Sequence, residues 1–526
     1  MKFRFKLVAV LIIALLVIGI YNLGAKNNEE AEEEEKQSYY QTETVYLWYS
    51  DETFTDYFTS AAVAFHEKNP DVRVIPQLVA PDEYIEYINS ASVSAENFPD
   101  LYVLTNDALE KAYLAGLASE TDRAGTVNKA HFSQSSIDSV TYHGKIIGYP
   151  LYFETSVLVY NKTYLKDWLE TVKENGREEE EALTKEEIEA EGGVIDDNGT
   201  PGEAEYERFD YESLTLEDLI PHTIEDIKKF ADDYDAPDGV DGVFKWDVSD
   251  VFYNYFFAGN YMIVGGEAGD DEGNIDIYNE NTIRCMNVYQ NLNQFFSIDA
   301  ETSSYEGMLE NFFDGKFVFT IATSDVIAKA DAEYKAAREQ HEQDVANLDK
   351  KLEELQKRYE SKDLKEEDYK AKVEEAKKSV TPVYEFGFAR IPELSDELQS
   401  RSLSVTNALV VNGYSEHKKA ANRVASFITT DYSDHLYSKT GMLAASYDAG
   451  YEDETFKLFQ EEYANSIPLP KLAEASNFWV QLEITFTKIW TGENTDELLR
   501  SLSEQIKTQI TGEEVKETPI KIKVEK

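Results

Sequence analysis

The stretch YHGKIIGYPLYFETSVLVYNK, residues 142–162, decides the fold of this chain. From Leu151 to Tyr160 its side chains alternate between two faces, which is the period-two pattern of a β-strand. Glu154 falls in the middle of this apolar and aromatic segment. Burial of a carboxylate is costly unless the group is paired or hydrogen-bonded, so the presence of Glu154 in this strand requires an explanation.

Strands and helices alternate on both sides of this stretch, as judged by the period of their apolar residues. The expected strands are 44–50, 72–79, 98–105, 381–392 and 408–415, and the expected helices are 56–70 and 416–441. Such alternation predicts an α/β fold whose sheets contain parallel strands.

The length and the charge of the chain restrict its organisation and its partners. A chain of 526 residues exceeds what one core usually organises, so we expect two or more lobes. Its 50 Lys and Arg stand against 102 Asp and Glu, a formal net charge of −52. This charge repels phosphate backbones, which argues against nucleic-acid binding and favours an uncharged or cationic partner. The 34 tyrosines offer flat apolar faces with a hydroxyl to a partly polar ligand.

The N-terminus has the pattern of a membrane-targeting segment. Basic residues precede an uncharged run from Leu7 to Ala25, which as a helix is about 28 Å long, close to the thickness of a bilayer core. We expect residues 1–25 to be a signal anchor or a signal peptide and favour a retained anchor. The preceding positive charges place the bulk of the chain outside the cytoplasm, tethered to the membrane, or secreted if the segment is cleaved. Residues 26–43 read as an acidic tether.

Two long segments interrupt the alternation of strands and helices. Residues 172–220 are acidic and broken by glycines, which indicates a surface insertion or a mobile loop. Residues 327–380 predict an antiparallel helical hairpin that reverses near Ser361–Asp363 and either docks a partner or is a solvated structural arm. Its apolar residues at three-four spacing are Val345, Leu348, Leu352, Leu355 and Tyr359.

Common catalytic and cofactor motifs do not occur in the sequence. The seven histidines are scattered, and there is no zinc-protease pair, nucleophile elbow or phosphate-binding loop. The acids of 269–280 miss the spacing of a calcium loop, so this segment predicts a β-turn. Cys285 is the single cysteine, which excludes an intrachain disulfide. We expect no cofactor and no metal, although a glycosidase built on two carboxylates stays open.

The order of short motifs resembles the extracellular solute-binding proteins of ATP-driven (ABC-type) importers, in the family 1, maltose-binding-like sugar branch. The resemblance runs from about Thr44 to about Ile510, and 142–162 is its strongest piece because several motif positions match there without a gap. The other pieces include LWYSDE (47–52), AFHEKNPDVRV (64–74), FPDLYVLTND (98–107), FGFARIP (386–392) and NFWVQLE (477–483).

The resemblance implies a two-lobed periplasmic-binding-protein-like α/β fold of type II, maltose-binding-like, with the helical hairpin as an insertion. In that fold the chain crosses repeatedly between two lobes. The expected N-lobe is 44–152 and 391–430, the expected C-lobe is 156–388 and 433–515, and the crossings fall near Tyr152–Thr155, Phe386–Ile391 and Phe427–Asp434.

The resemblance also implies which residues bind the ligand. Glu154 would accept hydrogen bonds from sugar hydroxyls, and the alternative is that it stabilises the hinge by pairing with a lysine or a backbone amide. The other expected ligand-binding residues are Glu52, Asp107, Tyr152, Trp246, Tyr253, Asn254, Phe257, Asp325, Phe478 and Trp479, with core packing as the alternative for the aromatic ones. Asp325 and Glu483 replace a stacking Trp and a binding Arg of that branch. We therefore expect another oligosaccharide than maltodextrin, or an amino-sugar or cationic ligand.

The function implied by the resemblance is capture and delivery without chemistry. The protein would be a monomer that closes on a small-molecule solute, an oligosaccharide, and presents it to the transmembrane subunits of an ABC permease. Two rivals stay open: a surface glycoside-acting enzyme, and a ligand-sensing or adhesion module that uses the hairpin as its docking arm.

Overall fold

The computed structural model describes residues 42–80, 83–94, 98–122, 125–182, 211–472 and 477–521. The expected anchor, 1–25, and nearly all of the expected tether, 26–43, lie outside the described residues, as do residues 183–210 of the acidic insertion. Among the described residues, no helix is both long enough and apolar enough to cross a membrane.

The first lobe is built on a six-stranded mixed sheet in the order β14-β13-β3-β1-β2, with β6 also paired to β13. β1 runs parallel to β2 and β3, whereas β13 is antiparallel to β3 and β6. The three strands expected near the N-terminus are therefore confirmed. The elements of this lobe are β1 (Glu43–Tyr49), α2 (Thr55–Lys68), β2 (Val72–Leu78), α3 (Tyr84–Ser94), β3 (Leu101–Thr105), α4 (Leu109–Leu114), α5 (Gln134–Ser139), β4 (Thr141–Tyr142), β5 (Lys145–Ile146), β6 (Tyr149–Thr155), β13 (Leu403–Val411), α14 (Lys418–Thr429), α15 (Leu436–Thr440), α16 (Glu454–Asn465) and β14 (Ile467–Pro468).

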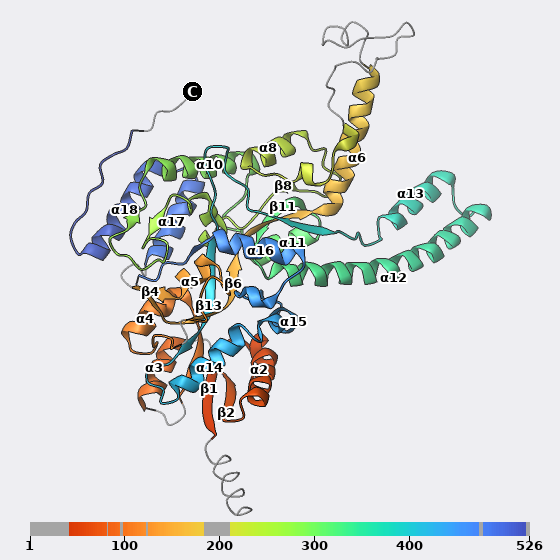
Figure 1. Cartoon of the computed structure of the whole chain (residues 1–526). Helices are drawn as coiled ribbons and strands as arrows, with labels where there is room; N and C mark the ends of the chain where they lie inside the picture. Colours follow the sequence, from red (N-terminus) through yellow and green to blue (C-terminus); the bar gives the residue numbers. More distant parts are fainter. Residues whose placement is uncertain are drawn as a thin grey trace, which may run out of the picture.

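The second lobe is built on a four-stranded sheet in the order β12-β7-β11-β8. Its own core is rich in aromatic side chains, among them the fully buried Trp246 and Trp490. The elements of this lobe are β7 (Val157–Asn161), α6 (Lys162–Ala182), α8 (Ile224–Asp233), β8 (Gly242–Phe244), α9 (Val251–Asn254), β9 (Ile263–Val264), β10 (Ile275–Asp276), α10 (Glu280–Phe296), α11 (Tyr305–Phe313), β11 (Phe317–Ala322), β12 (Phe386–Ala389), α17 (Phe478–Trp490) and α18 (Thr495–Thr511). Figure 1 shows the two lobes one above the other, joined by β6 and β13.

The chain first passes between the lobes within residues 142–162. The alternating segment is two strands, because β6 belongs to the first sheet and β7, after Ser156, to the second. A second passage connects β12 to β13. The third passage lies between β14 and α17, later than the Phe427–Asp434 that we expected. The reason is packing: Phe427, Leu436 and Phe459 lie in the same core as β1, so 433–468 belongs to the first lobe.

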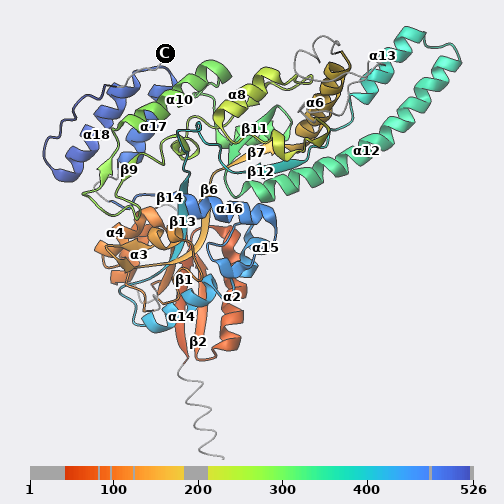
Figure 2. The same cartoon turned by 45° about the horizontal axis from the view of Figure 1, so that its top comes forward.

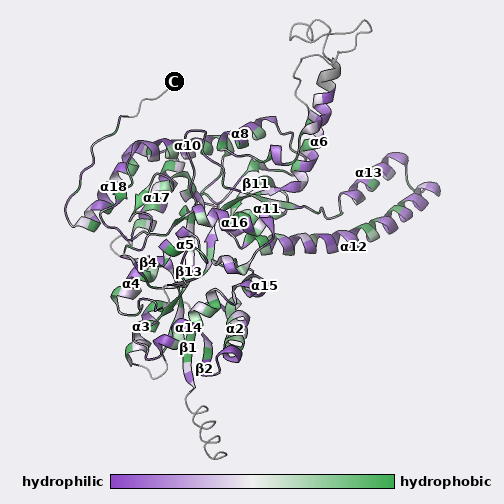
Figure 3. Ribbon diagram, in the orientation of Figure 1, coloured by the Kyte–Doolittle hydropathy of each residue, from purple (hydrophilic) through white to green (hydrophobic). Residues whose placement is uncertain are grey.

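The helical hairpin is present and projects from the body, as Figures 1 and 2 show. It consists of α12 (Val326–Glu360) and α13 (Glu366–Lys377), and the chain reverses at Lys362, whose φ is 64°. Leu355 and Ala376 are buried between the two helices, and the Tyr359 and Tyr369 rings stack at 4.7 Å. The outer faces are hydrophilic in Figure 3. We call α12 and α13 together the arm.

The structure also describes part of the acidic insertion and the segment expected to form a β-turn. Residues 172–182 of the expected insertion continue α6 as helix. In the segment 269–280, Asn274 N donates to Asp271 O at 3.0 Å and β10 pairs with β9, so the expected β-turn is confirmed as the tip of a short hairpin.

Candidate functional site

Glu154 lies one residue before the end of β6, where the chain leaves the first lobe. It is the one residue of β6 that is half-buried where the others are buried, and its cross-strand neighbour is Val405. The strand is fixed here by side chains from both lobes, because Ser324 Oγ donates to Phe153 O at 3.1 Å and Thr155 Oγ1 to Leu403 O at 3.1 Å.

The electrostatics of Glu154 differ from those of an ordinary surface acid. Burial, the charge of Asp325 and the charge of Asp51 together raise the pKa of Glu154 to about 7. Within the described part of the chain, no group forms a hydrogen bond with the Glu154 carboxylate. This carboxylate therefore has free capacity to accept hydrogen bonds from a bound molecule.

Tyr152 lies two residues before Glu154, and its side chain is on the same face of the strand. It is 8% exposed, and its ring stacks on Phe54 with centroids 4.7 Å apart. The two rings line a small pocket of about 130 Å³ at the carboxyl ends of β1 and β3. In open α/β sheets, ligands bind at the carboxyl ends of the strands. The other residues that line this pocket are Tyr49, Ser50, Asp51, Tyr84, Val103, Leu104, Thr105 and Asn407.

The second lobe contributes a pair of tyrosines and an acid to the same region. Tyr253, in α9, and Tyr305, at the start of α11, stack with centroids 4.5 Å apart and planes 11° apart. The Tyr305 hydroxyl donates to Asp325 Oδ1 at 2.7 Å, and Lys329 Nζ lies 2.7 Å from the other carboxylate oxygen. Burial first, and then the charges of nearby acids, of which Asp250 contributes most and Glu154 least, raise the pKa of Tyr253.

Four of the expected ligand-binding residues are core residues instead. Trp246, Asn254, Phe257 and Phe478 have no exposed surface. Asn254 accepts from Trp246 Nε1 at 2.8 Å and donates to the Asp247 and Asp250 carbonyls, so its amide is used within the protein. Our expectation that these four side chains touch a ligand is wrong, because the second core closes around them.

Three other expected residues lie at or near the surface. Glu52 is exposed in a 3-10 turn whose N-cap is Asp51, and Asp107 is exposed in the turn after β3. Trp479 is half-buried at the start of α17, with its ring 5.9 Å from that of Tyr255.

The structure thus brings together Tyr152, Glu154, Tyr253 and Asp325, and adds Asp51 and Tyr305, which sequence reasoning missed. Asp51 precedes the expected Glu52, and its N-cap bond to Thr53 N at 2.9 Å was a recognisable local pattern. Tyr305 carried no such signal, since it reaches Asp325 only through the fold. We call Tyr152, Glu154, Tyr253, Tyr305 and Asp325 the cleft group.

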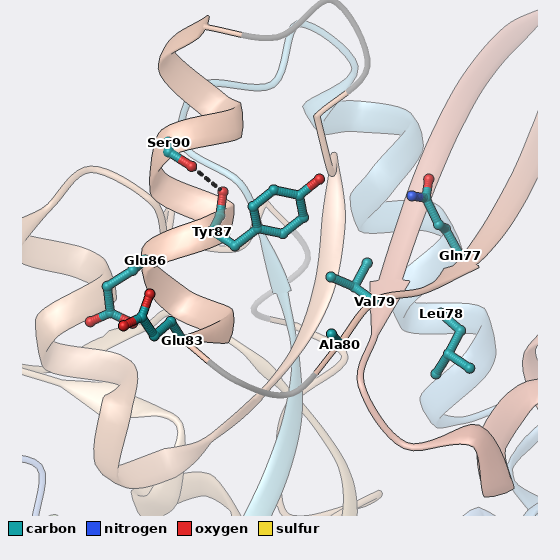
Figure 4. A pocket seen from close by; sticks show the side chains of 8 residues that line it. All are labelled: Gln77, Leu78, Val79, Ala80, Glu83, Glu86, Tyr87 and Ser90. Carbon is teal, nitrogen blue, oxygen red and sulfur yellow. Dashed lines mark hydrogen bonds between the residues drawn. The ribbon is translucent and has the colours of Figure 1, made fainter.

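A larger, open hollow lies on the same lobe as the small pocket, between the end of β2 and α3. Its volume is about 700 Å³, and its lining residues are Gln77, Leu78, Val79, Ala80, Glu83, Glu86, Tyr87 and Ser90. Figure 4 shows the Tyr87 ring reaching from α3 toward Val79, with Glu86 on the same helix and Glu83 just before its first residue. The Tyr87 ring stacks on the buried Trp48 at 5.2 Å, which holds it in place although half of it is exposed. Among the described residues, no group of three or more His, Cys, Asp or Glu side chains is suited to hold a metal ion.

Two lobes joined by repeated crossings, with an acid that has no hydrogen-bond partner among the described residues and stacked aromatic rings where they meet, are the features of a protein that binds a solute. The chain belongs to the bacterial extracellular solute-binding proteins, because the model of that family matches residues 60–457. The family is one of binding proteins and is extracellular.

Solved structures show the same fold at low sequence identity. The extracellular solute-binding protein of Staphylococcus aureus, in complex with maltose, is 14% identical, with 89% of this chain and 98% of that chain covered and a TM-score of 0.62. The maltose-binding protein MalE of Listeria monocytogenes, also with maltose, is 18% identical, with 90% and 100% covered and a TM-score of 0.59. MalX of Streptococcus pneumoniae, with maltopentaose, is 18% identical, with 89% and 99% covered and a TM-score of 0.55. No curated protein sequence matches the chain.

Proposed function

We propose that the protein captures an oligosaccharide between its two lobes and delivers it to the membrane subunits of an ABC-type importer. No bond is made or broken in this function. Solute binding shifts the balance between an open and a closed arrangement of the lobes, through contacts that are complete only in the closed form. The N-terminal segment would tether the protein to the outer face of the cell membrane.

The observation that carries this proposal is the Glu154 carboxylate, which is largely buried at a lobe crossing and has no hydrogen-bond partner among the described residues. Sugar hydroxyls donate hydrogen bonds and so match such a group, while the faces of Tyr152 and Tyr253 match the apolar edges of a sugar ring. The family supports an extracellular solute, and the structural neighbours that were solved with maltose and maltopentaose support an oligosaccharide.

The acids of the cleft group restrict the charge of the ligand. Asp325 brings negative charge, Glu154 adds to it above its pKa of about 7, and Asp51 is a third acid within electrostatic reach of Glu154. Anionic sugars are therefore disfavoured, and neutral oligosaccharides or amino sugars are favoured. The same pair of acids is also what a glycosidase needs, so the test must separate binding from turnover.

The experiment is thermal unfolding of the full chain across a panel of neutral oligosaccharides, amino sugars, acidic sugars and polyamines. The detergent must lack a sugar head group, since a maltoside would compete for the site. A solute at about 100 times its dissociation constant adds roughly 2.7 kcal/mol to the free energy of unfolding. We expect such a shift with neutral or amino oligosaccharides and recovery of the unaltered sugar. A shift with cations alone would contradict the sugar assignment, and recovery of a shortened sugar would replace transport by catalysis.

A further inference from the structure

The arm begins at the cleft group, with no linker between them. Its first residue, Val326, follows Asp325 directly, and Lys329 in its first turn pairs with Asp325 at 2.7 Å. The Lys329 ammonium also lies 5.1 Å from the centre of the Tyr305 ring and 3.3 Å from Glu306. A molecule that contacts Asp325 would therefore compete with Lys329 for the same carboxylate.

The root of the arm touches both lobes. The arm emerges from β11 of the second lobe, yet Val326 and Ile327 are buried in the cluster that also contains side chains of β1 and α15. The contact with α15 is close, since a Cβ at Gly441 would stand 3.2 Å from the Ala328 Cβ. A change in the angle between the lobes must therefore alter the packing of the first turns of α12.

The arm itself is stiff enough to carry such a change outward. α12 is an uninterrupted helix of 35 residues, about 52 Å long. α13 packs against it along a seam in which Leu355 and Ala376 are buried. The Tyr369 hydroxyl donates to Gln356 Oε1 at 2.7 Å near the far end. A rotation of about 5° at the root therefore moves the far end by about 4–5 Å.

Beyond its root, α12 is hydrogen-bonded to Thr381, in the segment that leads from α13 back to β12, and a space lies between this contact and the root. His341 Nδ1 donates to Thr381 O at 2.7 Å, and Asp344 accepts from Thr381 N at 3.0 Å and Oγ1 at 2.6 Å. Between this contact and the root lies a hollow of about 600 Å³. The hollow separates the stem of α12 from the rest of the lobe, with Phe313, Asp314, Lys316, Glu333, Tyr334, Ala336, Ala337, Gln340, Thr381, Pro382, Tyr384 and Phe386 as its lining.

We propose that the arm acts as a lever: binding of a solute changes the direction of the arm relative to the second lobe. A solute that contacts Asp325 weakens the Asp325–Lys329 pair, and the arm then rotates toward or away from the hollow. The loaded and empty proteins then present the arm differently to a protein partner at the membrane. This inference rests on the proposed function for the solute, but the role of Lys329 in fixing the arm does not.

The test uses pulsed electron paramagnetic resonance to measure distances between spin labels at three exposed positions of the full chain. The positions are K357C on the arm, K229C on α8 of the second lobe and K419C on α14 of the first lobe. Cys285 stays unlabelled because it is fully buried, and burial raises the pKa of its thiol to about 12. The probes are maltotetraose, cellotetraose and chitotetraose, each at millimolar concentration.

We first compare Lys329→Met with Lys335→Met in the protein without sugar. Lys335 is exposed on the same helix and has no ion pair among the described residues, so it is a matched control. Lys329→Met should shift or broaden the distance between 357 and 229, and Lys335→Met should leave it unchanged. Equal distance distributions in the two variants and the parent would overturn the lever, whatever the solute is.

Sugar is then added to the parent protein. A change in the distance between 229 and 419 reports lobe closure, and we expect the distance between 357 and 229 to change with it by several ångströms and to lose this response in Lys329→Met. Lobe closure with an unchanged distance between 357 and 229 overturns the lever and leaves the proposed function intact. Lobes that move with none of the three sugars count against the proposed oligosaccharide, and the comparison of the two lysine variants still decides on the lever.

Discussion

The Tyr305 hydroxyl donates a hydrogen bond of 2.7 Å to the Asp325 carboxylate. Asp325 also pairs with Lys329, and the Tyr305 ring stacks on Tyr253, so these four side chains form one connected group. The group links Tyr253 in α9 to the first turn of the arm. Its contacts are made by side chains from α9, α11 and α12, which the fold brings together from distant parts of the chain.

The pKa of Glu154 predicts a pH dependence of stability with a definite sign. The group titrates near 7 in the native state and ordinarily at 4.5, so the native protein binds more protons than the unfolded chain between these values. Its contribution therefore lowers the free energy of unfolding as the pH rises from about 4.5 to about 7. In Glu154→Gln, the decrease in the free energy of unfolding between pH 5 and pH 8 should be smaller than in the parent by roughly 1–3 kcal/mol, as measured by urea unfolding. An identical pH profile in the variant and the parent would contradict the raised pKa.

Solute binding should depend on Glu154 and not on burial of an acid as such. Glu462 is the matched control, since burial also raises its pKa to about 7, and its residue is 8% exposed within α16. At pH 8, Glu154→Gln should weaken binding by about tenfold or more, because a charge-assisted hydrogen bond contributes about 1.5–3 kcal/mol. Glu462→Gln should change stability but leave affinity within about twofold. Titration calorimetry with the active sugar of the panel decides, and equal losses in both variants would count against Glu154 as a ligand.

The arm should unfold separately from the body when its seam is broken. Leu355 is 5% exposed between α12 and α13, whereas Val345 on the same helix is 38% exposed. Leu355→Asp places a charge in the seam, which should raise amide exchange in α13 and the outer half of α12 by an order of magnitude or more. Val345→Asp should have little effect. Exchange that stays at the parent's level in Leu355→Asp would mean that the seam does not stabilise the arm.

Gly387 should be intolerant of a side chain because of close packing in the second sheet. A Cβ at this position in β12 would stand 2.2 Å from the ring of Tyr160 in the neighbouring β7. Gly387→Ala should therefore lower the free energy of unfolding by about 1–3 kcal/mol. Gly125→Ala is the control, since a Cβ there meets nothing within 4 Å. Chemical denaturation of both variants checks the difference, and equal midpoints would contradict it.

Local features of the sequence predicted a large part of the fold. The strands at 44–50 and 72–79 and the helix at 56–70 occur within a residue or two of their expected bounds, and so does the reversal of the arm near Ser361–Asp363. The helix expected over 416–441 is broken after Thr429, before α15. Thr429 and Thr430 bond back to the carbonyls of Ala425 and Ser426, a competition with the helix that an apolar period does not reveal.

Which aromatic side chains face the cleft was decided by packing alone. Trp246, Tyr253 and Phe257 lie close together in sequence, in a short helix and its flanking turns, and of the three only Tyr253 retains exposed surface. The same holds for the partner of Asp325, because Tyr305 is brought to it by the arrangement of α11 and β11.

The sequence by itself determined the α/β alternation and the arm, because period, turn chemistry and caps act between residues that are near in the chain. The acid at the lobe crossing was expected only from the resemblance to a known family. Only the tertiary structure decided that 433–468 returns to the first lobe, that four expected ligand residues are buried, and that Asp51 and Tyr305 join the site. These outcomes depend on which apolar surfaces cover one another, and burial is a property of the assembled core that no short segment carries.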